Sequence, residues 1–545
     1  MSAPRLTLKR LFLPLAALIL LAAAALQVHT ASLEAQTFDE AVHLTAGYSY
    51  WKTGDFRLNQ EHPPFAKLLA ALPLLTMGLR FDTTSKNWTL PDQSEMGREF
   101  LYTNTRPADE ILAAARSVTI GFSLVLGLAL ALWVRSRFGE LAALAALALY
   151  AFDPNFIAHG RYVTTDVPEA CLTFLAVIAW LAWLEHGRKR DLIFASLALG
   201  LSMATKFSAP FVLPIHFALA LVQVVRGRMV WFTAFGSFAA VIVSAAAICL
   251  LCYGSATFQV DRLADHRYFS GLNELAQHND DGHPSFLLGK VNRKGDARYF
   301  PVAFAVKSTE AALIGLLLAL ALLPRLWRRH GPLVCLALLA YPVFYFALSM
   351  AGNINIGVRH LLPIYPFLFA LIAAALAAIP KPAASASTAA MAIGLIAANS
   401  TIYPDYLAYF NQFAGGPAGG TRYLLDSNVD WGQDVKKLKL YMDEHNIPLV
   451  QFAYFGMADL EYYGVRNGGL PGADEPRNID TLDNWVAVSV TNLYDVYFDR
   501  PTFSWLQRFR PAARIGWSIY VYDLRQQTIP AGKRPLPPPA PTAAP

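Results

Sequence analysis

Long apolar runs separated by shorter polar segments dominate the hydropathy pattern of this chain. A helix of about 20 apolar residues can cross about 30 Å of hydrocarbon. Runs of this kind recur along the chain and predict about eleven membrane-spanning helices. They lie at 11–29, 111–134, 140–157, 167–184, 191–205, 208–225, 229–252, 301–323, 332–350, 361–379 and 388–403. The pattern therefore predicts a polytopic α-helical membrane protein.

The character of the chain changes after the last apolar run. Residues 404–528 contain three β-type runs and one helical pattern, at 449–455, 485–490, 518–522 and 434–445. These elements predict a small α/β domain outside the membrane. Residues 529–545 are rich in Pro and Ala, which is typical of a disordered tail. We therefore expect a transmembrane domain over 1–403, the α/β domain and this tail.

Basic residues indicate the orientation of the spans, because Lys and Arg accumulate in cytoplasmic loops. If the predicted spans alternate in direction, every basic cluster falls on one side of the membrane. The clusters are Arg5/Lys9/Arg10, Arg135/Arg137, Arg188/Lys189/Arg190, Arg226/Arg228 and Arg325/Arg328/Arg329. The N-terminus is then cytoplasmic, and the C-terminus and the first outer loop, 30–110, are extracytoplasmic. A cleaved signal peptide is the alternative for the first span, but it leaves the later clusters without a consistent topology.

Composition supports a membrane protein and argues against a nucleic-acid partner. Hydrophobic residues make up 55% of the 545 residues and charged residues only 15%, whereas soluble proteins carry nearer a quarter charged residues. The net charge of +6 is modest, and no block of Lys and Arg alternates with aromatic residues, so nucleic acid is not an expected partner. The four cysteines lie in apolar runs and are interpreted as buried small hydrophobic residues. The Ala-rich composition favours a bacterial inner membrane.

The first outer loop holds the strongest candidate for chemistry, the segment Thr37-Phe38-Asp39-Glu40. Two adjacent carboxylates near a membrane surface can bind a hydroxyl group and take its proton. Thr37-x-x-Glu40 also has the spacing of a capping box that opens a helix ending near Lys52, which gives Glu40 a structural interpretation. Asp39 is not needed for this cap. Local sequence leaves both interpretations open.

A second helix is predicted in the same loop, after His62-Pro63-Pro64-Phe65-Ala66-Lys67. Pro at a helix start followed by an apolar stretch is typical of a helix in the membrane interface. Lys67 falls in its first turn, where the helix dipole disfavours a cation. A bound phosphate would resolve this conflict. A lysine that reaches toward lipid headgroups is the alternative.

Charged residues at the outer ends of spans are further candidates, since charge inside a membrane is costly. They are Lys206, Lys307, Arg359 and His360. Several cations on one side, facing a loop with acidic residues, favour a site for a lipid phosphate and a reacting hydroxyl group.

Two other outer segments carry polar clusters. Arg161 and Asp166 flank a short turn in the second outer loop, where they could form a salt bridge. The segment Asp426–Asp434 begins like an EF-hand calcium loop, but Trp431 replaces the required Gly and Lys437 replaces the bidentate Glu. We therefore interpret this segment as an Asx-rich turn that caps the following helix.

Together these segments resemble the protein O-mannosyltransferases and, more widely, the bacterial GT-C-type transferases, which include the lipid A aminoarabinose transferase. The resemblance is carried by Phe38-Asp39-Glu40, His62-Pro63-Pro64-Phe65-Ala66-Lys67, and Arg161-Tyr162 with Asp166. It covers roughly residues 30–360. Each motif alone is weak, whereas their joint order and spacing are specific. The chain departs from the eukaryotic enzymes in the loop 253–300, which is too short for their β-trefoil insert, and in its C-terminal domain.

The resemblance implies an inverting transferase with a sugar donor on polyprenyl phosphate and an extracytoplasmic protein or glycolipid acceptor. It makes Asp39 the catalytic base, Glu40 its helper and Asp166 a second acidic residue. The candidates for binding the lipid phosphate are Lys67, Arg161, Lys307, Arg359 and His360, with His62 as a further site residue. The resemblance implies a phosphate contact only for Lys67 and Arg161, and the other three cations are added because of their charge near the membrane.

Several alternatives stay open at this point. Mg²⁺ or Mn²⁺ could bridge Asp39, Asp166 and the phosphate, although the sequence does not require a metal. A transporter or flippase for a lipid-linked sugar would also explain the spans and cations. That function predicts polar residues near the bilayer midplane, whereas the charges here lie at the outer ends. A non-catalytic scaffold is the third alternative, and the retention of the acidic and basic motif residues argues against it.

Overall fold

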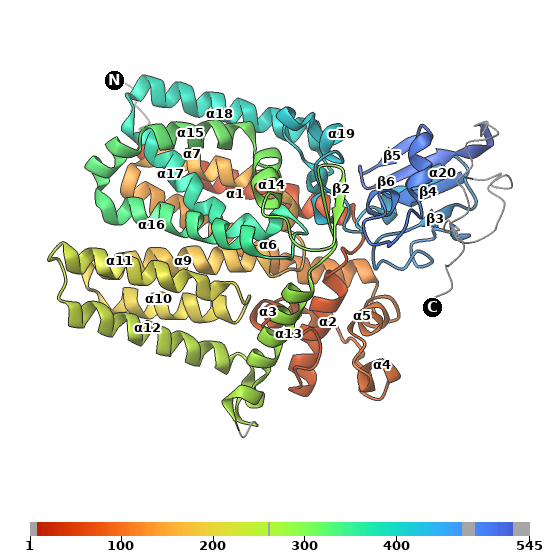
Figure 1. Ribbon diagram of the computed structural model, residues 1–545, viewed down its shortest axis with the longest axis horizontal. Helices are drawn as coiled ribbons and strands as arrows, with labels where there is room; N and C mark the ends of the chain where they lie inside the picture. The colour runs from red at the N-terminus through yellow and green to blue at the C-terminus, as the bar shows by residue number, and fades with distance from the viewer. Residues whose placement is uncertain (1–7, 260–261, 471–484, 527–545) are drawn as a thin grey trace, which may run out of the picture.

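The computed structural model describes residues 8–259, 262–470 and 485–526. The predicted tail, 529–545, lies outside these residues, as does Arg5 of the first basic cluster. Figure 1 shows long helices packed side by side, with a small sheet at one end of the bundle. Shorter helices of the outer loops lie next to the sheet at the same end.

A helix or helix pair forms at each predicted span. In the described part of the chain, seven helices are long and apolar enough to cross a membrane. They are α1 (Leu8–Ser32), α6 (Ala108–Phe138), α9 (Asp166–His186), α12 (Trp231–Leu251), α16 (Leu323–Ala351), α17 (Tyr365–Ala378) with its preceding 3₁₀ turn (Val358–Ile364), and α18 (Lys381–Ile402). Three other predicted spans form the shorter helices α7 (Glu140–Ala151), α10 (Lys189–Met203) and α11 (Leu213–Val225). The chain is therefore a multi-pass helical membrane protein.

The prediction of one continuous span at 301–323 is wrong. This segment forms α14 (Tyr299–Lys307) and α15 (Glu310–Ala321), which are bent by 110° relative to each other. Ser308 is extended between them, with ψ of 144°. The Thr309 side chain accepts a hydrogen bond from the backbone N–H of Ala312 and so opens the second helix. The break falls on the polar stretch Lys307-Ser308-Thr309-Glu310, which the longer apolar run on either side outweighed in the prediction.

Basic residues of two predicted clusters contact the ends of neighbouring helices. Arg137, at the end of α6, forms an ion pair with Glu185 near the end of α9. Arg329, in the first part of α16, donates a hydrogen bond to the carbonyl oxygen of Ala377 at 2.8 Å. This arrangement agrees with the basic clusters sharing one side, and the direction of the chain across the membrane stays a prediction.

The outer loops contain short helices and one hairpin. They are α2 (Glu40–Thr53), α3 (Phe65–Ala71), α4 (Lys86–Thr89), α5 (Gln93–Tyr102), α8 (Pro154–His159), α13 (Arg267–Asp281), and the hairpin of β1 (Ser285–Leu287) and β2 (Lys290–Asn292). The helix predicted to end near Lys52 is confirmed as α2. It ends at Gly54, whose φ of 69° lies in the left-handed region that glycine adopts without strain.

The C-terminal part forms the predicted α/β fold. Its elements are α19 (Gly416–Gly420), α20 (Val435–Glu444), β3 (Gln451–Ala453), β4 (Trp485–Ser489), α21 (Val490–Leu493), β5 (Ala513–Ile515) and β6 (Ile519–Asp523). The strand order is β3-β4-β6-β5, with β3 parallel to β4 and the other pairs antiparallel. The three predicted strands and the predicted helix are confirmed, and β5 is an additional strand.

This sheet is buried on both faces, because successive side chains of a strand point in opposite directions. Ala487 and Val521 are cross-strand partners that pack in one core with Leu438 of α20. Their neighbours Val486 and Tyr522 belong to the core that the membrane helices share. The C-terminal domain therefore packs against the membrane helices, and the domain boundary after residue 403 stays a prediction.

Candidate functional site

Asp39 lies at the start of α2, where the chain leaves the first span. Its side chain is 24% exposed, and its Oδ2 accepts a hydrogen bond from a terminal nitrogen of Arg359 at 3.1 Å. The same Arg359 nitrogen lies 3.6 Å from Oδ2 of Asp166. The fold therefore brings together three residues that the sequence predicted for the site, from three distant segments.

Asp166, at the first position of α9, extends this cluster inward. Its side chain is 2% exposed, and its Oδ1 lies 2.7 Å from Nζ of Lys206. Lys206 also lies 3.4 Å from Oε2 of Glu169, one turn further along α9. Asp39, Arg359, Asp166 and Lys206 thus form a row of alternating charge from the open edge of the site toward the bundle.

Trp431 of the C-terminal domain contacts Arg359. Its guanidinium lies 4.3 Å from the centre of the Trp431 ring, a cation–π contact. The carbonyl oxygen of Trp431 accepts a hydrogen bond from the backbone N–H of Phe38 at 2.9 Å, next to Asp39. Trp431 is a site residue that our sequence interpretation did not assign. A large aromatic residue inside an otherwise polar turn was the available signal.

Two nitrogen atoms of the site lack a partner within the part of the chain that the structure describes. They are Nε of Arg359 and Nε2 of His360, and both are buried. Buried donors are almost always hydrogen-bonded. The Arg359 donor, and the His360 nitrogen in the tautomer that carries its hydrogen, would be satisfied by an oxyanion entering the site.

Glu40 is buried and its carboxylate is fully occupied. Oε1 accepts hydrogen bonds from Nε of Arg116 at 2.8 Å and from the Val163 N–H at 3.0 Å. Oε2 accepts from a second Arg116 nitrogen at 2.6 Å and from the Thr37 N–H at 2.8 Å. The Thr37 contact is the glutamate half of the predicted capping box. The geometry favours the structural interpretation, and a catalytic role for Glu40 stays a prediction.

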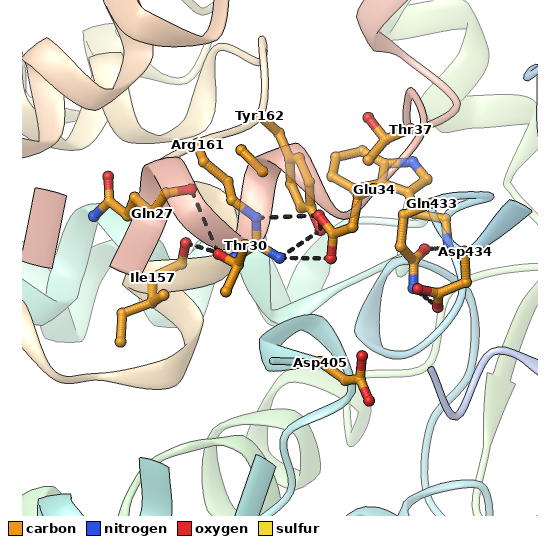
Figure 2. A network of polar contacts seen from close by, with 12 residues as sticks. Gln27, Thr30, Glu34, Thr37, Ile157, Arg161, Tyr162, Asp405, Gln433 and Asp434 are labelled. Atoms are coloured by element: carbon orange, nitrogen blue, oxygen red, sulfur yellow. Dashed lines mark hydrogen bonds and ion pairs between the residues drawn. The ribbon is translucent and has the colours of Figure 1, made fainter. Parts of the chain in front are cut away.

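Arg161, in the second outer loop, forms a buried ion pair with Glu34, which follows the end of α1 (Figure 2). Two guanidinium nitrogens donate to Glu34 at 3.1 and 2.7 Å, and a third donates to the Ile157 carbonyl at 2.9 Å. Tyr162 donates to the same carboxylate at 3.0 Å. The suggested salt bridge between Arg161 and Asp166 is therefore wrong. The predicted phosphate contact of Arg161 stays a prediction.

Lys67 lies in the first turn of α3, as predicted, with its side chain buried. Its Nζ donates to the carbonyl oxygens of Asn59 and His62, each at 2.7 Å, and to the Tyr50 hydroxyl at 2.9 Å. These acceptors match the three hydrogens of an ammonium group. The conflict with the helix dipole is thus resolved within the protein, and a phosphate contact of Lys67 stays a prediction.

Lys307 is also buried, at the end of α14. Its Nζ donates to the carbonyl oxygens of Leu407 at 2.8 Å and Asn428 at 2.7 Å, and it lies 4.6 Å from the centre of the Phe410 ring. These contacts tie the bent segment to the chain that enters the C-terminal domain. They favour a structural role, and the predicted phosphate contact stays a prediction.

His62 lies beside His43 of α2, with the ring centres 5.0 Å apart and edge to face. His43 Nδ1 lies 3.0 Å from the Val163 carbonyl oxygen. Burial lowers the pKa of His43 to about 4 and lowers that of His62 well below its ordinary value. Both imidazoles are therefore neutral near pH 7, and the charges of Lys206 and Asp166 act on His62.

Comparison with known proteins bears on this arrangement. The family described as dolichyl-phosphate-mannose-protein mannosyltransferase matches residues 109–252. The crystal structure of ArnT from Cupriavidus metallidurans in the apo state is similar with a TM-score of 0.50 and 13% identity, over 93% of this chain and 97% of that chain. ArnT bound to undecaprenyl phosphate gives a TM-score of 0.49 at 13% identity, with the same coverage. The Archaeoglobus fulgidus oligosaccharyltransferase, tethered with an acceptor peptide, gives 0.44 at 14% identity, over 84% of this chain and 59% of that chain. No curated protein matches the sequence.

The chain has the GT-C fold. The resemblance that the outer-loop motifs predict is thereby confirmed, and it extends beyond them to nearly the whole chain. The matched family segment begins in α6 and ends after α12, so it includes Asp166 and Lys206. Together these findings support a membrane glycosyltransferase.

In this GT-C chain the loop Asp426–Asp434 has a different role from the predicted helix cap. Asp434 precedes α20, but its side chain caps no backbone N–H of that helix. Its Oδ2 instead accepts from the Ser518 hydroxyl at 2.7 Å, and its Oδ1 lies 2.7 Å from Lys437. The capping interpretation is therefore wrong. Asn428 Oδ1 accepts from the Val358 N–H at 3.0 Å, so the loop positions the residue before Arg359.

The geometry around Asp39 and Asp166 bears on the predicted divalent cation. The described residues contain no group of three or more His, Cys, Asp or Glu side chains arranged to hold a metal ion. The space between Asp39 and Asp166, where a divalent cation was considered, holds a nitrogen of Arg359. A role for Mg²⁺ or Mn²⁺ stays a prediction.

Proposed function

We propose that this chain is an inverting glycosyltransferase that moves a sugar from polyprenyl phosphate to an extracytoplasmic hydroxyl group of a protein or glycolipid. The observation that carries the proposal is the partly open carboxylate of Asp39 beside the buried guanidinium of Arg359, 3.1 Å away. The occurrence of ArnT with bound undecaprenyl phosphate supports a lipid phosphate as the carrier. The ArnT apo structure shares the fold of this chain.

In the proposed reaction Asp39 accepts the proton of the acceptor hydroxyl group. The acceptor oxygen attacks the anomeric carbon while the bond from that carbon to the phosphate oxygen breaks. Negative charge grows on the departing phosphate, and fixed cations stabilise it. Nε of Arg359 and Nε2 of His360 have no partner among the described residues and suit this role, Arg359 as a cation and His360 as an N–H donor in the tautomer that carries hydrogen at Nε2.

Asp166 acts in this scheme through its neighbours. It lies between Arg359 and Lys206, so its charge balances two cations that would otherwise repel each other. This balance keeps Arg359 in place when the phosphate is absent. Lys206 adds positive charge behind the phosphate without a direct contact.

A divalent cation would compete with Arg359 for the space between Asp39 and Asp166. Removal of divalent ions with EDTA therefore tests the metal separately from the base. Full activity after chelation would show that the protein's own cations suffice. Activity that is lost and then restored by Mg²⁺ or Mn²⁺ would show that a metal takes part.

The central experiment compares Asp39→Asn with the wild-type chain in a deletion strain. Mass spectrometry of glycolipids and glycoproteins identifies the product that disappears on deletion, and hence the sugar and the acceptor. Transfer by purified protein from that lipid-linked sugar is then expected to fall about a hundredfold to ten-thousandfold in Asp39→Asn. Near-normal transfer by the folded variant would reject Asp39 as the base.

The matched control is Asp55→Asn. Asp55 lies in the same outer loop and forms an ion pair with Arg57. This variant removes a carboxylate from the same segment and is expected to keep wild-type transfer. A flippase predicts a different result: deletion would strand the lipid-linked sugar on one leaflet, and purified protein would form no new glycosidic bond.

The proposed location is a bacterial inner membrane, with a cytoplasmic N-terminus and an extracytoplasmic C-terminus. The contacts of Arg137 with Glu185 and of Arg329 with the Ala377 carbonyl oxygen join basic residues to the ends of neighbouring helices and support this orientation. Reporter fusions at the two termini test it. Opposite reporter activities, with the C-terminal reporter active outside the cytoplasm, are expected.

A further inference from the structure

A row of titratable side chains leads from the site to the outer surface. It joins the first outer loop, the loop around α13, and two segments of the C-terminal domain. Its members, from the surface inward, are Glu61, His278, His283, Tyr497 and Asp426. The transfer mechanism proposed above uses none of them.

The contacts along this row are continuous. Nδ1 of His278 lies 3.4 Å from Oε1 of Glu61, and its Nε2 lies 3.0 Å from Nδ1 of His283. Nε2 of His283 lies 3.1 Å from the Tyr497 hydroxyl. That hydroxyl donates a hydrogen bond to Oδ2 of Asp426. Each inner member can both give and receive a hydrogen, which a proton path requires.

The inner end of the row adjoins the catalytic residues. The Phe38 ring, next to Asp39, stacks on Phe455 at 5.5 Å between ring centres, and Phe455 stacks on Tyr497 at 5.3 Å. The charge of Asp39 acts on both Asp426 and His283. Tyr497 and its partners are thus held at the same edge of the site as the proposed base.

Asp426 has two properties that suit a proton carrier. It is nearly buried, and burial raises its pKa to about 6, although the hydrogen bond from Tyr497 acts in the opposite direction. A carboxyl group with such a pKa gains and loses a proton easily near neutral pH. Its φ of 57° is unusual for a residue other than glycine. Such backbone conformations are often retained at functional sites.

The outer end of the row reaches solvent. The side chains of His278 and Glu61 are 31% and 34% exposed. Water and buffer can therefore reach the His278 imidazole. The row therefore connects a buried carboxyl group with an exposed imidazole.

We propose that Asp426, Tyr497, His283 and His278 form a path by which the proton taken from the acceptor leaves the site. The path rests on the proposed transferase function, because Asp39 must lose that proton before the next turnover. Asp39 passes the proton through water in the site to Asp426. The path then matters most while the lipid phosphate and the acceptor cover the direct route from Asp39 to solvent.

The shift along the path balances. With Asp426 protonated, the carboxyl hydrogen moves to the Tyr497 oxygen, the Tyr497 hydrogen to Nε2 of His283, and the Nδ1 hydrogen of His283 to Nε2 of His278. Three bonds to hydrogen break and three form, and no electron acceptor is required. Asp426 is left as a carboxylate, and His278 becomes an imidazolium beside Glu61, from which water or buffer takes the proton.

The test compares the first turnover with later turnovers in Tyr497→Phe and His283→Asn. Both are assayed in dilute buffer with the donor identified from the deletion strain. The first turnover is expected to keep the wild-type rate, because Asp39 begins each experiment without a proton. Steady-state turnover is expected to fall at least about tenfold, in line with a lost acid–base step. Added imidazole, a small proton carrier, is expected to restore it.

The control is Tyr494→Phe in the same domain. Its hydroxyl lies 3.5 Å from Thr421 and outside the row, so wild-type steady-state turnover is expected. Unchanged turnover in both row variants would overturn the path. An equal loss in the first and later turnovers, without recovery in imidazole, would also overturn it and indicate a structural role. Failure of the proposed function is distinguishable, since the wild-type chain would then transfer no sugar at all.

Discussion

Two arginine–carboxylate pairs lie near each other in this protein and differ in how completely their polar atoms are used. Arg161 and Glu34 are both fully buried, and every nitrogen of Arg161 donates to a partner. Arg359 makes one hydrogen bond to Asp39, and its Nε has no partner among the described residues. A pair whose polar atoms all have hydrogen-bond partners stabilises the fold, whereas a pair with an unpartnered donor can still bind a ligand.

The difference follows from where the partners originate. Arg161 uses the Ile157 carbonyl one turn earlier and the carboxylate at the end of the first span. Arg359 meets residues from the first outer loop, α9 and the C-terminal domain. The first pair is completed by contacts near the start of the second outer loop, while the second lies where three separate segments meet.

The largest expected effect is the loss of stability in Arg161→Met. The substitution leaves Glu34 buried without its cation, which costs about 3–5 kcal/mol. Thermal unfolding in detergent is the measurement. The double variant Glu34→Gln/Arg161→Met removes both charges and is expected to regain part of the loss. Unchanged stability with a large loss of transfer would make Arg161 a site residue and reverse the comparison.

Arg359→Gln is expected to show the opposite pattern. The rate of transfer should fall about a hundredfold to a thousandfold, or about 2.7–4 kcal/mol, the usual cost of one lost transition-state donor. The unfolding temperature should change little, because Asp39 is partly open to water. Transfer kinetics and thermal unfolding on the same preparation test both statements. A destabilised variant with normal transfer would place Arg359 with the structural pair.

Trp431→Leu tests how much the C-terminal domain contributes to the role of Arg359. The substitution keeps an apolar side chain but removes the aromatic ring that contacts Arg359. A desolvated cation–π contact contributes about 2 kcal/mol, so transfer should fall roughly thirtyfold. His159→Phe is the matched variant, because the His159 ring also packs against Trp431, 5.9 Å between centres, and its replacement keeps the Trp431 ring. Equal losses in both variants would indicate general disturbance of packing.

The smallest expected effect is that of His360→Asn. Nε2 of His360 is buried without a partner among the described residues. The loss of one hydrogen bond to the phosphate costs about 0.5–1.5 kcal/mol, or roughly twofold to tenfold. The change should appear in the KM for the lipid donor more than for the acceptor. An effect confined to the acceptor would move His360 out of the phosphate-binding part of the site.

Much of the fold could be predicted because it depends on patterns that the chain displays directly. Apolar runs mark a helix or helix pair at each predicted span, and short apolar β-type runs mark β3, β4 and β6. The site could be predicted in part. Asp39, Asp166 and Arg359 do gather, since motif order and the cost of charge in a membrane both indicate functional residues.

The remainder depends on partners that a sequence does not display. Lys67 and Lys307 are satisfied by backbone carbonyl groups, which every residue carries, so no residue type indicates them. Glu34 lies at the end of a span and resembles a solvated end residue until the fold brings Arg161 to it. Trp431 enters the site from the loop of a domain far along the chain.

The sheet that lies against the membrane helices has a consequence for biosynthesis. The ribosome makes Asp39 long before it makes Trp431 and β6, the strand between β4 and β5. Arg359 therefore lacks its supporting ring while most of the chain is already inserted. A partly synthesised chain holds the acidic motif without the surface that shapes it. On the proposed function, a chain that has not yet made Trp431 and β6 would neither consume donor lipid nor modify acceptors.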